Sequence, residues 1–108
     1  MARILLIEPD KEQATRIEAF LRLEKHDVIR CNILEAREAL EQSLSSRDVA
    51  ILDVTTDNRE IRLALAQIRK YRTHDGPAPM ILCISRVKHG PRFELELEKW
   101  GARLVYVC

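Results

Sequence analysis

Two acidic residues, each at the end of an apolar run, are the side chains in this sequence best placed to do chemistry. Asp53 follows the apolar run 49–52, and Glu8 follows the run 4–7. Short apolar runs bounded by polar residues are typical of strands buried on both faces of a parallel sheet. Open α/β sheets place their sites at the carboxyl ends of such strands. Two carboxylates meeting there need a cation or a proton to relieve their repulsion. We therefore expect a polar site centred on Asp53.

The elements that position this site alternate between strand and helix patterns. Asp10 and Asn32 are suitable N-caps for two of the helices. Strands are expected at residues 2–7, 27–31, 48–53, 80–84 and 104–107, and helices at 11–24, 33–44, 59–71 and 91–100. Strand–helix alternation implies right-handed crossovers and a parallel sheet with helices on both faces. The sequence thus predicts one α/β domain over residues 1–108, a doubly wound five-stranded parallel sheet.

Composition narrows the class of protein further. The 108 residues carry 18 Lys and Arg against 17 Asp and Glu, a near balance that argues against nucleic acid as a partner. No apolar run is long enough to span a membrane. Cys31, Cys83 and Cys108 are odd in number and lack the spacing of a disulfide framework or a zinc site. We expect a cytoplasmic protein without membrane contact.

Four stretches resemble the receiver domain of two-component response regulators, in the right order and over essentially the whole chain. Ile-Leu-Leu-Ile-Glu-Pro-Asp (4–10) resembles the first strand of the family with its acidic cluster. Asp-Val-Ala-Ile-Leu-Asp-Val (48–54) is similar to the strand that presents the phosphoacceptor aspartate. Met-Ile-Leu-Cys-Ile-Ser (80–85) and Trp-Gly-Ala-Arg-Leu-Val-Tyr-Val (100–107) resemble the fourth strand and the lead into the fifth. The resemblance implies a flavodoxin-like strand order, 2-1-3-4-5.

The same resemblance implies roles for four residues. In the family, an aspartate attacks a phosphoryl group while a divalent cation held by oxygen ligands neutralises the transferred oxygens. Asp53 would be the phosphoacceptor, and Glu8 would be one of the acidic pair in the pocket. The carbonyl of Thr55 would be a backbone metal ligand, and Ser85 would be the switch hydroxyl.

The sequence departs from the family pattern at four positions, one of which is Asp57, where the loop after Asp53 usually has a proline. Pro9 replaces the second acidic residue, the direct metal ligand, and the neighbouring Asp10 is wanted as a helix cap. Cys108 replaces the lysine of the fifth strand. The aromatic switch position falls on Val105, with Tyr106 one residue late and so on the opposite face. Each charge-stabilising group lost around a transferring phosphoryl costs about 3 kcal/mol or more of barrier. We expect an atypical, or pseudo-, receiver with impaired or absent Asp phosphorylation.

Such a module would be a signalling or scaffold protein and not an enzyme, with no cofactor and at most weak Mg²⁺ binding. An alternative is a functional phosphoacceptor in which Asp10 supplies the lost carboxylate, and Arg86 or Lys88 the lost lysine. A more remote alternative is a metal-dependent nucleic-acid enzyme. Toprim domains also pair a glutamate after one strand with an aspartate after a later one, but Pro9 and Thr55 stand at two of their signature positions.

The partner is expected to be a protein. Receivers have a fifth helix after the fifth strand, and residue 108 comes before it. In a complete chain, one strip of the sheet would then stay uncovered and favour a homodimer or a docked partner. In a piece of a longer regulator, the helix would simply be missing. The surface of the fourth helix and fifth strand, near Trp100, is a second candidate interface.

Overall fold

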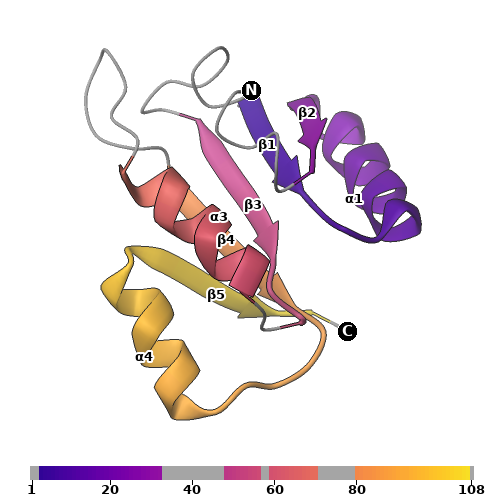
Figure 1. Cartoon of the computed structure of the whole chain (residues 1–108). Coiled ribbons are helices and arrows are strands. Elements are labelled where there is room, and N and C mark those ends of the chain that lie inside the picture. The colour runs from indigo at the N-terminus through magenta and orange to yellow at the C-terminus, as the bar shows by residue number, and fades with distance from the viewer. Residues whose placement is uncertain (1–2, 33–47, 57–58, 71–79, 108) are drawn as a thin grey trace.

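The computed structural model describes residues 3–32, 48–56, 59–70 and 80–107. The strands in this part of the chain form a parallel sheet in the order β2-β1-β3-β4-β5 (Figure 1). They are β1 (Arg3–Ile7), β2 (Asp27–Cys31), β3 (Val49–Asp53), β4 (Met80–Ser85) and β5 (Ala102–Tyr106). The helices are α1 (Lys11–Leu23), α3 (Arg59–Lys70) and α4 (Pro91–Lys99). The predicted flavodoxin-like α/β fold and strand order are confirmed.

Most predicted boundaries agree with the structure to within two residues. Asp10 caps α1 as predicted, because its carboxylate accepts hydrogen bonds from the second and third N–H groups of the helix. The last strand begins at Ala102, two residues earlier than predicted. Gly101, with φ of 74°, turns the chain directly from α4 into β5. The helix expected at 33–44, after Asn32, lies outside the described residues.

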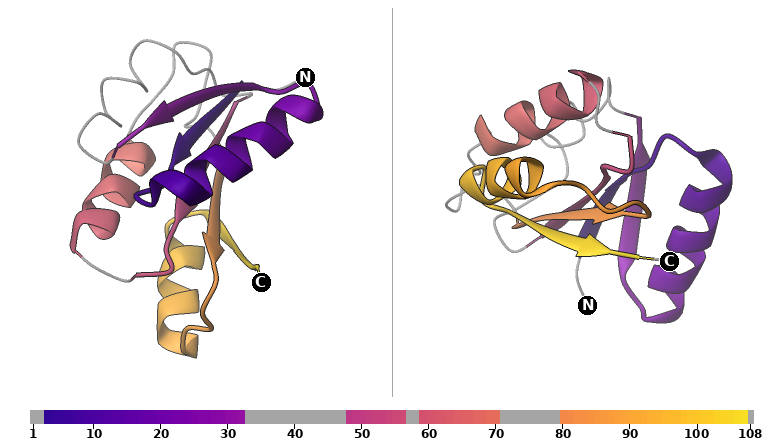
Figure 2. Two further views of the ribbon diagram at one scale, coloured as in Figure 1. Left: turned by 90° about the vertical axis from the view of Figure 1, so that its right-hand side faces the viewer. Right: turned by 90° about the horizontal axis from the view of Figure 1, so that it is seen from below.

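Helices lie on both faces of the sheet (Figure 2). On one face, α3 and α4 bury the larger core, which includes Leu5, Leu52 and Cys83 from the strands. On the other face, α1 packs Ala14 against Ile4, Leu6, Val28 and Ile51, with Ile17 and Leu21 beside them. The central strands β1 and β3 are therefore covered on both faces. This packing holds their carboxyl ends in place, where Glu8 follows β1 and Asp53 ends β3.

The α1 face is covered unevenly. Leu82 and Ile84 of β4 are only partly buried there, and Val105 of β5 is 40% exposed. Helical spacing predicts that Phe20 shares the inner face of α1 with Ile17 and Leu21, but this prediction is wrong, because the Phe20 side chain is 63% exposed. Among the described elements, no second helix packs beside α1 to cover it. The helices in the described ranges are all too short or too polar to cross a membrane.

Candidate functional site

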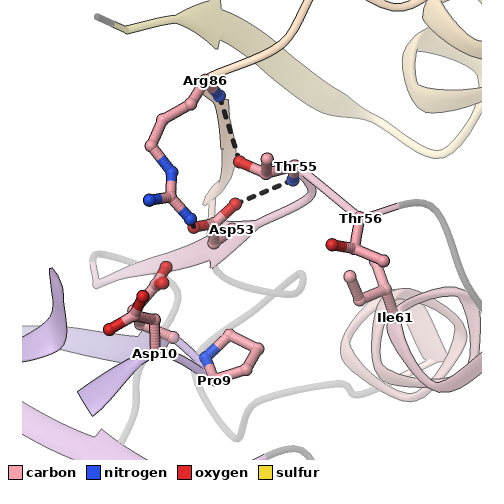
Figure 3. A pocket seen from close by; sticks show the side chains of 8 residues that line it. Pro9, Asp10, Asp53, Thr55, Thr56, Ile61 and Arg86 are labelled. Atoms are coloured by element: carbon pink, nitrogen blue, oxygen red, sulfur yellow. Dashed lines mark hydrogen bonds and ion pairs between the residues drawn. The ribbon is translucent and has the colours of Figure 1, made fainter. Parts of the chain in front are cut away.

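Adjacent strands bring the two predicted carboxylates together. Ile7 of β1 pairs with Leu52 of β3, so the residues that follow, Glu8 and Asp53, stand side by side. Both are buried, with 8% and 6% of their surface exposed. A cavity of about 390 Å³ opens beside them at this edge of the sheet (Figure 3). Its lining consists of Glu8, Pro9, Asp10, Asp53, Thr55, Thr56, Ile61 and Arg86.

The Asp53 carboxylate already has partners on both oxygens. Its Oδ1 accepts a hydrogen bond of 2.7 Å from the backbone N–H of Thr55. Its Oδ2 lies 3.8 Å from Nη2 of Arg86, whose side chain arches over it from the loop after β4 (Figure 3). Burial by itself would raise the pKa of Asp53, but hydrogen bonds from Glu8 and Thr55, together with the Arg86 charge, hold that pKa below its ordinary value. Asp53 is therefore a paired anion.

Glu8 is in the opposite situation. Both of its carboxylate oxygens are inaccessible to solvent, and weak contacts with Asp53 and the backbone of Asp10 are the hydrogen bonds that reach them. Burial, followed by the hydrogen bond to Asp53 and the charge of that carboxylate, raises the pKa of Glu8 to about 8. The backbone of Asp10 and the Arg86 charge offset this only in part. At neutral pH Glu8 therefore keeps a proton, and it can donate that proton to Asp53.

Two of the residues expected near a magnesium ion offer it little at this edge of the sheet. Magnesium needs several hard oxygen ligands in near-octahedral geometry. Pro9 has no side-chain oxygen, and Oδ1 of Asp10 caps α1 at 3.0 and 3.2 Å from the backbone nitrogens of Glu12 and Gln13. Nowhere in the described ranges do three or more His, Cys, Asp or Glu side chains gather as metal ligands.

Ser85 is fully buried at the end of β4, and its hydroxyl is occupied within its own turn. Its Oγ donates to the carbonyl of Val87 at 2.6 Å and accepts from the backbone N–H of Val87 at 3.2 Å. The hydroxyl therefore shapes the start of the loop between β4 and α4. In this conformation no hydrogen bond joins it to Asp53.

Two further contacts bind that loop to the site. The backbone N–H of Arg86 donates to Oγ1 of Thr55 at 3.0 Å. Nε2 of His89 lies 2.9 Å from the carbonyl oxygen of Val54, directly after Asp53. Arg86 was predicted as a substitute cation, but the contact of His89 with Val54 was not, because nothing local in the sequence links residues 35 positions apart. Cys108 lies outside the described residues.

Comparison of the chain with protein-family models, with curated proteins and with solved structures finds no match.

Proposed function

We propose that this domain is an atypical receiver that acts as a signalling or scaffold module, through protein contacts and without catalysis. The resemblance of its strand ends to those of receivers and the strand order support this assignment. Asp53 occupies the phosphoacceptor position, but its phosphorylation is impaired or absent.

The observation that carries the proposal is the pairing of Asp53 inside its own cavity. Arg86 neutralises the carboxylate, and Thr55 holds one of its oxygens. Phosphoryl transfer needs a free nucleophile and charge stabilisation around the transferred oxygens, worth about 3 kcal/mol or more of barrier for each group. Glu8 with its proton and Pro9 with its hydrocarbon ring supply none of that stabilisation.

A second candidate function, a working phosphoacceptor, is favoured by the position of Arg86. A guanidinium that reaches over the acceptor carboxylate could stabilise phosphoryl oxygens as a lysine would. This reading needs Arg86 to release Asp53 and then to bind the new group. It also needs a metal, which Asp10 would have to ligate through Oδ2 while Oδ1 caps α1.

Incubation with acetyl phosphate and Mg²⁺, followed by intact-mass measurement, separates the two candidates. We expect no stoichiometric gain of a phosphoryl group over a time in which a receiver with the complete acidic pair and lysine is fully modified. Asp53→Asn serves as the control for chemistry at other residues. If a phosphoryl group is added rapidly and Asp53→Asn abolishes the addition, the pseudo-receiver proposal is wrong and the domain is a working phosphoacceptor.

We propose that the protein partner, a second copy or another protein, binds the open half of the α1 face, which is the part of that face formed by Leu82 and Ile84 of β4 and Val105 of β5. Ile84 and Val105 are paired neighbours there and are incompletely buried. The α4–β5 surface, with Trp100 half-buried near it, is the other candidate. The cytoplasm remains the expected compartment.

Sedimentation over about a hundredfold range of concentration tests self-association through this face. For a homodimer, the average mass should rise with concentration, and Val105→Asp should return it to the monomer because a buried unpaired charge is costly. Val87→Asp, at an exposed apolar residue of the β4–α4 loop, is the matched control and should still associate. If the wild-type protein stays monomeric at every concentration, it does not self-associate through this face, and the partner that binds there is a different protein.

A further inference from the structure

The outer edge of β5 presents backbone groups that no strand in the described part of the chain pairs. β5 is the last strand of the sheet, with β4 on its inner side (Figure 1). The backbone N–H of Val107, directly after β5, donates to the carbonyl of Ser85 in β4 at 2.8 Å. Because alternate residues of a strand direct their backbone groups to opposite sides, those of Ala102, Leu104 and Tyr106 point away from β4. A row of donors and acceptors is thus open to an added strand.

A hollow of about 390 Å³ lies between this edge and α4. Its lining consists of Glu94, Glu98, Ala102, Arg103, Leu104 and Tyr106. The side chains of Ala102 and Leu104 pack against the core on the α4 face of the sheet, so the hollow opens on that face. A strand added to β5 would lie along it.

The hollow is acidic, because its lining sets two carboxylates against the one guanidinium of Arg103. Within the described ranges, no cation pairs with Glu94 or Glu98. Glu94 accepts a hydrogen bond from the Tyr106 hydroxyl through Oε1, and its Oε2 remains for a ligand. A basic side chain is therefore the complement of this wall.

The spacing of the two carboxylates matches that of an extended chain. Four residues advance a helix by about 6 Å, and two residues advance a strand by about 6.7 Å. Basic residues at alternate positions of an added strand would share one face and reach Glu94 and Glu98 together. The residues between them would lie on the opposite face beside Val105, which is 40% exposed, so apolar side chains suit those positions.

From this arrangement we infer that the outer edge of β5 binds an extended segment of another protein in which basic and apolar residues alternate. Backbone hydrogen bonds add the segment to the sheet, and the alternating side chains select it. Its Lys or Arg side chains meet Glu94 and Glu98, and its apolar side chains extend the surface at Val105. The inference rests on the proposed function in taking the partner to be a protein, and it names the chemistry of that partner.

A second copy of this chain is a poor occupant of the same edge. Antiparallel pairing of two β5 strands about a two-fold axis would place both α4 helices on one face of the joined sheet. Glu94 and Glu98 of both copies would then gather around the axis, where like charges repel. The acidic hollow therefore favours a different, basic chain.

Amide hydrogen exchange followed by NMR tests strand addition, with the blocked peptide Ser-Lys-Val-Lys-Val-Lys-Ser as the probe. At saturating peptide, exchange at the Leu104 and Tyr106 amides should slow by about tenfold, because these groups gain a partner strand. The Val105 amide already points to β4 and should keep its rate. Ser-Lys-Lys-Lys-Val-Val-Ser has the same charge without the alternation, and a peptide N-methylated at all lysines and valines cannot donate to the edge. Neither control peptide should slow the Leu104 and Tyr106 amides.

Glu98→Lys should weaken binding of the alternating peptide by about tenfold at low salt, because it turns an exposed ion pair into a repulsion. Glu96→Gln is the matched control, since Glu96 lies on the same helix but pairs with Arg62 of α3. This variant should bind the peptide as the wild type does.

Strand addition at β5 is overturned if millimolar alternating peptide does not bind, if the Val105 amide slows as much as Leu104, or if either control peptide protects the edge equally. Equal effects of Glu98→Lys and Glu96→Gln would also overturn it. Protection of Leu104 and Tyr106 that grows with protein concentration alone would assign the edge to a second copy instead. None of these outcomes involves a phosphodonor, so this inference and the pseudo-receiver proposal fail separately.

Discussion

Glu8→Gln should make the protein more stable at neutral pH, by about 2–3 kcal/mol in the free energy of unfolding. The wild-type side chain must take up a proton to be buried beside Asp53, whereas glutamine is neutral already and can donate an N–H to that carboxylate. For a domain of this size, such a gain raises the midpoint of thermal unfolding by roughly 10 °C or more.

The gain should depend on pH with a definite sign. Folding raises the pKa of Glu8 from 4.5 to about 8, so between these values the folded chain binds a proton that the unfolded chain has released. Wild-type stability from this group therefore falls as the pH rises through that window, and the advantage of Glu8→Gln grows. Denaturant titrations at several pH values measure the difference. Glu98→Gln, at an exposed glutamate of α4, should show no such trend. If the difference in unfolding free energy between Glu8→Gln and wild type were the same at every pH, the raised pKa of Glu8 would be contradicted.

Pro9→Asp should strengthen magnesium binding at the cavity beside Asp53. Pro9 lines the cavity beside Glu8 and Asp53, so the substitution adds a third carboxylate among them. A divalent cation can then displace the proton from Glu8 and compete with Arg86 for Asp53. If the dissociation constant reaches about 1 mM, 10 mM Mg²⁺ should stabilise the variant by about 1.4 kcal/mol.

Thermal unfolding with and without Mg²⁺, at pH 8, measures this effect. Pro9→Asn removes the same ring without adding charge and should show no response to the metal. Adding Arg86→Gln to Pro9→Asp should tighten binding further, because the internal cation that competes for Asp53 is gone. Equal responses of Pro9→Asp and Pro9→Asn would show that the added carboxylate does not reach the cavity.

The fold was predictable because its signals are local. Two uninterrupted apolar runs mark β1 and β3, and capping and turn residues such as Asp10 and Gly101 mark where helices begin and end. The exposure of Phe20 was not predicted. Helical periodicity places it near the inner face of α1, but it does not reveal which flank of the helix another element covers.

The site was predictable only in part. Strand ends in a parallel sheet bring Glu8 and Asp53 to one edge, and this follows from sequence order. The different protonation of the two carboxyl groups cannot be predicted from sequence order, because it depends on burial and on Arg86, which approaches from another loop. The link between His89 and Val54 depends on how the β4–α4 loop folds back, and no short-range pattern records that.

The open half of the α1 face has a practical consequence for spectroscopy. Environment-sensitive dyes such as ANS are used to recognise molten globules, because they fluoresce on exposed apolar surface. Here Leu82, Ile84 and Val105 offer such surface in the fully folded domain. Dye fluorescence from this protein is therefore no sign of loosened packing until the native baseline has been subtracted.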